Sequence, residues 1–184
     1  MKVLVADVAD SLDRAHKMWG WYLALGVAMI ALGAYAITYG MAATLASIVV
    51  LGAVCLAAGI LRVAAAFQSH GAGHFALFLM LGILDIIVGW MLMQHAVAGA
   101  LVVTLLLALL FVFEGIYGLV GALWLQFPYY GWVAFSGIVS LVLGILLWAE
   151  WPISATWFIG FAVGLNFIMS GVAWSALALK LKAA

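Results

Sequence analysis

The chain has 184 residues, of which 71% are hydrophobic and only 7% are charged, and its formal net charge is zero. Soluble domains have about 25% charged residues, so this composition excludes an ordinary soluble protein and indicates a membrane protein. The sequence has no basic stripe or nucleic-acid-binding motif, and we therefore expect no nucleic-acid partner.

Residues 1–18 precede the first apolar segment and are too short and too polar to cross a membrane. Apolar side chains such as Leu4 and Val8 recur there at helical spacing, whereas Asp10 and Arg14 lie on the other side. This pattern predicts an interfacial amphipathic helix. A flexible, solvated tail is the alternative.

Six apolar segments follow, each close to the roughly 20 residues that a helix needs to cross the hydrocarbon core. They lie near residues 19–39, 42–67, 73–94, 97–124, 130–149 and 153–179. Continuous apolar runs favour helices over a closed β-barrel, whose strands alternate in polarity. The predicted fold class is all-α: a polytopic membrane protein whose six-helix transmembrane domain occupies residues 19–184.

The six segments are three copies of one unit, which we expect to be helix hairpins over residues 19–67, 73–124 and 130–179. The first helix of each unit has a pair of glycines: Gly26 and Gly33, Gly82 and Gly89, Gly137 and Gly144. Small residues allow helix backbones to approach closely, so these glycines are predicted at helix contacts. Three hairpin repeats of the same orientation imply pseudo-threefold organisation about an axis along the membrane normal.

All basic residues lie on one side of this arrangement: Lys2, Arg14, Lys17, Arg62, Lys180 and Lys182. By the positive-inside rule this side is cytoplasmic, and both termini are therefore predicted in the cytoplasm. The single cysteine, Cys55, excludes an internal disulfide.

Asp85 and Glu114 are the two carboxylates inside the predicted spans. A charged side chain is costly in hydrocarbon unless it is paired, protonated or facing water, so both are candidate functional residues. Asp85 shares a helical face with Gly82 and Gly89 and is expected to face the glycine-lined interior. Proton sensing or relay is one reading of these carboxylates, and a hydrogen bond that ties helices together is the other.

Two further polar residues lie within the spans. Arg62 is within about two helical turns of the depth of Glu114, which makes a charge-assisted Arg62–Glu114 pair plausible. Alternatively, Arg62 extends to the headgroups and Glu114 is neutral inside the bundle. Asn166 in the sixth segment is expected to form an interhelical hydrogen bond.

Metal, cofactor and enzyme signals are weak. His70 and His74 are four residues apart, but Gly71 and Gly73 predict a flexible turn, so no metal site is expected. The sequence shows no nucleophilic triad, phosphate-binding loop, dinucleotide fingerprint or haem-attachment motif. We therefore expect neither an enzyme nor a bound cofactor.

The third unit begins with Gly131-Trp132, keeps the paired glycines, has a turn with Pro152 and Ala155-Thr156, and closes with Ser170-Gly171. In these features it resembles the HdeD family of small bacterial membrane proteins. The resemblance covers residues 19–179, although Ala76-Leu77 replaces the Gly-Trp start in the middle unit. It implies a non-enzymatic stress protein of the bacterial inner membrane, acting in acid resistance or membrane proton handling.

Two other functions remain compatible with the sequence. One is an accessory or assembly subunit packed against a larger membrane complex, and the other is a small channel or transporter. The expected partners are membrane lipids, together with either further copies of the chain or a larger membrane complex.

Overall fold

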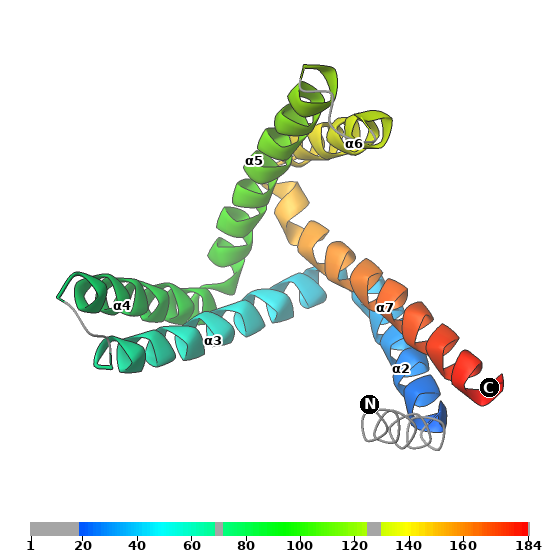
Figure 1. Ribbon diagram of the computed structural model, residues 1–184, viewed down its shortest axis with the longest axis horizontal. Coiled ribbons are helices and arrows are strands. Elements are labelled where there is room, and N and C mark those ends of the chain that lie inside the picture. Colours follow the sequence, from blue (N-terminus) through cyan, green and yellow to red (C-terminus); the bar gives the residue numbers. More distant parts are fainter. Residues whose placement is uncertain (1–18, 69–71, 125–129, 184) are drawn as a thin grey trace, which may run out of the picture. The chain divides into compact units, whose positions relative to one another are not determined.

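The computed structural model describes residues 19–68, 72–124 and 130–183, and these residues form helices without any strand. The predicted amphipathic helix over residues 1–18 lies outside this described part. The six long helices are α2 (Trp19–Thr38), α3 (Gly40–Ala66), α4 (Ala72–Gln94), α5 (Ala96–Leu123), α6 (Tyr130–Ala149) and α7 (Phe158–Ala183) (Figure 1). All six are long and apolar enough to span a membrane, which confirms the predicted fold class.

The predicted spans match these helices closely except for the last one, which was predicted over residues 153–179 and is observed over Phe158–Ala183. A short 3-10 helix, η1 (Ile153–Thr156), precedes α7, which begins only at Phe158. The Ser154 hydroxyl donates a hydrogen bond to the Leu147 carbonyl oxygen over 2.8 Å. The Thr156 hydroxyl donates to the Ile153 carbonyl oxygen, also over 2.8 Å. Side-chain bonds of this kind compete with regular helical hydrogen bonds and delay the start of the helix.

Three helices are longer than the membrane requires. The helices α3, α5 and α7 have 27, 28 and 26 residues, which correspond to about 40 Å at 1.5 Å per residue. A hydrocarbon core is about 30 Å thick, so each of them must tilt or extend into the headgroup region.

The chain divides into two compact units, residues 1–39 with 160–184, and residues 40–159. In the first unit, α2 packs against α7 through glycines on both helices. A Cβ placed on Gly33 would lie 2.5 Å from the Gly164 carbonyl oxygen, and one placed on Gly171 would lie 2.6 Å from the Gly26 carbonyl oxygen. Any side chain at these positions would force the two backbones apart.

The second unit contains two such pairs, α3 with α4 and α5 with α6 (Figure 1). A Cβ on Gly59 would lie 2.7 Å from the Gly82 carbonyl oxygen, and one on Gly89 would lie 2.6 Å from the Gly52 carbonyl oxygen. In the other pair, a Cβ on Gly115 would lie 2.8 Å from the Gly137 carbonyl oxygen. Gly144 faces the backbone of Ala108 and Val112 in the same way. Thus all six glycines predicted to mediate packing lie at close helix contacts.

The pairing nevertheless differs from the hairpins that the sequence repeat suggested. The glycine contacts join the second helix of one repeat to the first helix of the next, as in α3–α4 and α5–α6. Both helices of a repeat have glycine stripes, so the stripes themselves do not distinguish pairing within a repeat from pairing between repeats. The packed pair is therefore offset by one helix from the repeated hairpin.

Equivalent positions of the three repeats meet inside the second unit. Thr44, Ala100 and Thr156 are separated by 56 positions each, as are Gly26 and Gly82. All three line one cavity of about 30 Å³, where the starts of α3 and α5 meet η1. One equivalent position from each of the three repeats therefore lines the same cavity within this unit.

Candidate functional site

The α3–α4 contact positions a charged pair within two membrane spans. Gly59 and Gly82 bring the two backbones together, Arg62 follows Gly59 by three residues, and Asp85 follows Gly82 by three residues. Because the helices are antiparallel, the two Cα positions are displaced by about 9 Å along the axis at 1.5 Å per residue. The long arginine side chain bridges this separation.

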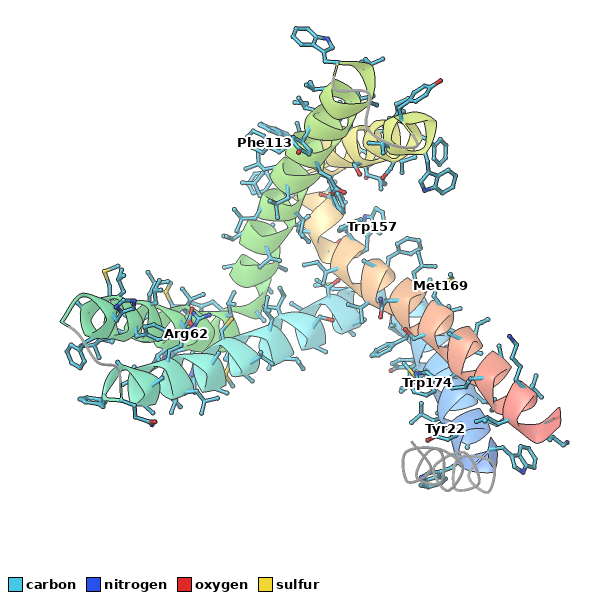
Figure 2. All side chains as sticks on the ribbon, viewed as in Figure 1. Tyr22, Arg62, Phe113, Trp157, Met169 and Trp174 are labelled. Atoms are coloured by element: carbon cyan, nitrogen blue, oxygen red, sulfur yellow. The ribbon has the colours of Figure 1, made fainter. Side chains whose placement is uncertain are left out.

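Arg62 and Asp85 form an ion pair. The Arg62 Nη1 donates a hydrogen bond to the Asp85 Oδ2, and Figure 2 shows Arg62 on the α3–α4 pair. The Asp85 side chain is 22% exposed and that of Arg62 is 48% exposed. The contact lowers the cost of holding both charges inside the membrane. Asp85 thus lies at the edge of the glycine contact, next to its partner.

The Arg62–Glu114 pair considered from the sequence does not form within the chain. Glu114 is exposed on α5, and the structure gives its carboxylate no hydrogen bond or ion pair with a described residue. The neighbouring Gly115 is buried against Leu141 of α6, and successive helical residues are rotated by about 100°. This rotation takes Glu114 away from α6. Within the second unit, Glu114 therefore lies on the exposed face of α5, and the alternative expectation of a neutral Glu114 inside the bundle stays a prediction.

Asn166 differs from its prediction in the same way. It lies exposed on α7, and no interhelical hydrogen bond of its side chain is found among the described residues. Gly164, two positions earlier, is the residue that faces α2. A two-residue offset on a helix is about 200°, so Asn166 lies on the far side of α7 from α2.

Two buried hydroxyl groups were not singled out by sequence reasoning. Thr104 on α5 is fully buried, and its Oγ1 has no hydrogen-bond partner among the described residues; the Oγ of the half-buried Ser175 on α7 has none either. Thr104 is the repeat equivalent of the buried Ile48, 56 positions earlier. The buried hydroxyl group of Thr104 could have been found from the sequence, because Thr104 is a polar residue at a repeat position that is otherwise apolar.

The described residues contain no group of three or more metal-ligating side chains. His74 is exposed near the start of α4, whereas His70 lies outside the described residues. An apolar groove of about 230 Å³ lies between α4 and α5, with His95 at the turn that joins them. Its other lining residues are Val88, Met91, Leu92, Ala98, Gly99 and Val102. This lining offers hydrophobic contact but no set of polar groups that would orient a cofactor.

Comparison with known families gives one match. A family model described as "Short repeat of unknown function (DUF308)" matches residues 24–94 and 80–149, which together cover more than half of the chain. The two matches begin 56 positions apart, the same spacing as Gly26 and Gly82. Each match contains one close pair within the second unit, α3–α4 or α5–α6. No curated protein and no solved structure matches the chain.

Proposed function

The chain belongs to the DUF308 short-repeat family, and from this premise we propose that it is a non-enzymatic stress protein of the bacterial inner membrane that contributes to acid resistance. The resemblance of its third repeat to the HdeD family supports the proposal, as does the distribution of its basic residues, which favours cytoplasmic termini. The observation on which the proposal depends is the ion pair between Arg62 and Asp85 within the spans.

The ion pair offers a simple response to acid. Protonation of Asp85 removes the negative charge that compensates the Arg62 guanidinium. Arg62 lies four residues before the end of α3, so its long side chain can then extend toward the headgroups. The α3–α4 contact thereby loses its ionic link when the proton concentration rises.

Few other titratable groups lie near Asp85. Among the described residues, Arg62 is the charged side chain that α3 presents to it. On α4 itself, His74 lies about three turns before Asp85. On α5, which contacts α4 near its own start, His95 immediately precedes the helix. Both histidines lie near helix ends, so Asp85 is the group whose protonation bears directly on the ion pair.

The proposal is tested by survival of cells after an acid challenge. Cells that lack the protein are complemented with the wild-type chain or with Asp85→Asn, which keeps the side-chain volume but cannot ionise. We expect Asp85→Asn to lower survival to the level of the uncomplemented strain, while the amount of folded protein in the membrane stays the same.

Glu150→Gln is the matched control, because Glu150 is an exposed carboxylate that follows α6 outside the spans. It should leave survival unchanged. Full survival with Asp85→Asn would remove the ion pair from the mechanism, and loss of the protein from the membrane would assign the pair to folding.

A further inference from the structure

Glu114 is an exposed carboxylate within a membrane span, and it has no ionic partner among the described residues. It lies nine residues before the end of α5, about 13 Å from that end at 1.5 Å per residue. An exposed, ionised carboxylate within a span is costly. Its exposed neighbours on the helix surface are Leu110, Phe113 and Tyr117, none of which carries a positive charge. A basic side chain on a second copy of the chain would offset this cost.

Arg62 is the basic residue suited to this role. The other basic residues of the described part, Lys180 and Lys182, lie in the last turn of α7, and the Lys182 Nζ lies 4.8 Å from the Trp19 ring centroid. Arg62 uses its Nη1 for Asp85 and remains 48% exposed. A guanidinium has five N–H donors, so it can donate hydrogen bonds to a second carboxylate beside the first.

The two groups also lie at matching depth. Gly59 and Gly115 are repeat equivalents, 56 positions apart, and in a six-span topology α3 and α5 cross the membrane in the same sense because one span separates them. Glu114 directly precedes Gly115. The Arg62 side chain extends from beyond Gly59 back toward Asp85, so its guanidinium lies near the level of Gly59. Two copies inserted in the same orientation bring these levels into register.

Arg62 and Glu114 do not contact each other within one chain. The helices α3 and α5 meet near their starts, at the cavity lined by Thr44 and Ala100, whereas Arg62 and Glu114 lie in the later parts of these helices. We infer that Glu114 on α5 of one copy binds Arg62 on the α3–α4 pair of a second copy, forming a head-to-tail homo-oligomer. The interface then contains one guanidinium between two carboxyl groups, and a proton on either carboxyl makes the cluster neutral. Such a heterologous contact generates a ring when its rotation closes. The inference does not depend on the acid-resistance proposal.

Cross-linking between copies tests the interface. In a Cys55→Ala background, one tagged copy has Leu81→Cys, one turn before Asp85, and a second copy with another tag has Leu110→Cys, one turn before Glu114; both leucines are exposed. A flexible bis-maleimide should join the two tags in native membranes. Either variant expressed alone should give no cross-linked dimer, because a head-to-tail contact does not bring identical positions together.

Charge variants then separate the interface from the fold. Glu114→Gln in the Leu110→Cys copy should abolish the cross-linked band, while Glu150→Gln should leave it unchanged. Arg62→Gln combined with Asp85→Asn keeps the α3–α4 contact neutral and should also abolish the band, with helicity and melting temperature of the isolated chain retained. A monomer in lipid nanodiscs, cross-links to a different protein instead of a second copy, or a band that survives both charge changes would each overturn the inference.

Discussion

The α3–α4 and α5–α6 pairs have the same glycine contact but differ in the residues beside it. Three positions after the contact glycines, α3–α4 has Arg62 and Asp85, whereas α5–α6 has Gly118 and Ser140. The corresponding positions of the α2–α7 pair are Met29 and Trp174. Two of the three pairs therefore pack without any charge at these positions.

This difference shows that close packing of two helices in this protein does not require an ion pair. In α2–α7, Trp174 instead stacks on Tyr22 with ring centroids 5.7 Å apart (Figure 2). The charged pair is an addition to one of three otherwise similar contacts. Because the other two helix pairs pack without an ion pair, we treat the Arg62–Asp85 pair as a candidate functional site and not as a requirement of helix packing.

The largest expected effect comes from the glycines that the pairs share. Gly82→Leu and Gly137→Leu should each destabilise the protein by about 3 kcal/mol or more, because a side chain would meet the opposing backbone directly. Thermal unfolding in detergent measures the loss. Gly73→Leu on α4 and Gly131→Leu on α6 are the controls, since nothing lies within 4 Å of a Cβ at either position. Equal stability of test and control variants would contradict the packing.

A smaller effect should distinguish α3–α4 from the other pairs. Arg62→Ala leaves Asp85 without its partner and should cost about 2 kcal/mol in the isolated chain in detergent, because an unpaired charge then remains near the helix contact. The double variant Arg62→Ala with Asp85→Asn should recover about 1 kcal/mol of that loss. Unfolding of the four members of the cycle gives this coupling energy.

The partner of Arg62 is tested by a second cycle. Arg62→Ala and Glu114→Gln should be additive within about 0.5 kcal/mol in the isolated chain, since the two residues make no contact there. Strong coupling in that cycle, with none in the cycle that uses Asp85, would reverse the assignment of the ion pair.

The smallest expected effect concerns the buried hydroxyl group of Thr104 on α5. Thr104→Val replaces a buried hydroxyl that has no hydrogen-bond partner with a methyl group of similar size. It should stabilise the protein by about 1 kcal/mol and raise the melting temperature. The exposed Thr38 is the control, because its hydroxyl donates to the Ala34 carbonyl oxygen over 2.9 Å; Thr38→Val should bring no gain. A lower melting temperature for Thr104→Val would show that its hydroxyl is satisfied.

Much of the fold could be predicted because its determinants are local. Segment length and apolarity predict the six spans. The main difference between prediction and structure is the last helix, which begins only at Phe158. The positions of Gly26, Gly82 and Gly137 at helix contacts follow from the need of helices in lipid for small residues. The sequence identified both residues of the candidate site, Arg62 and Asp85. It did not identify them as partners, because Glu114 was proposed as the partner of Arg62.

Sequence alone thus determined that this is a six-span helical membrane protein with repeated glycine contacts. The apolar composition of each segment predicts a span, and the spacing of its glycines predicts a helix contact, without reference to any other segment. The tertiary structure decided which glycine stripes meet. Stripes of equivalent repeats are interchangeable in sequence, so only the folded chain distinguishes α3–α4 from α4–α5 as the packed pair. That choice places Asp85 beside Arg62, and the rotation of α5 and α7 against their partners leaves Glu114 and Asn166 exposed.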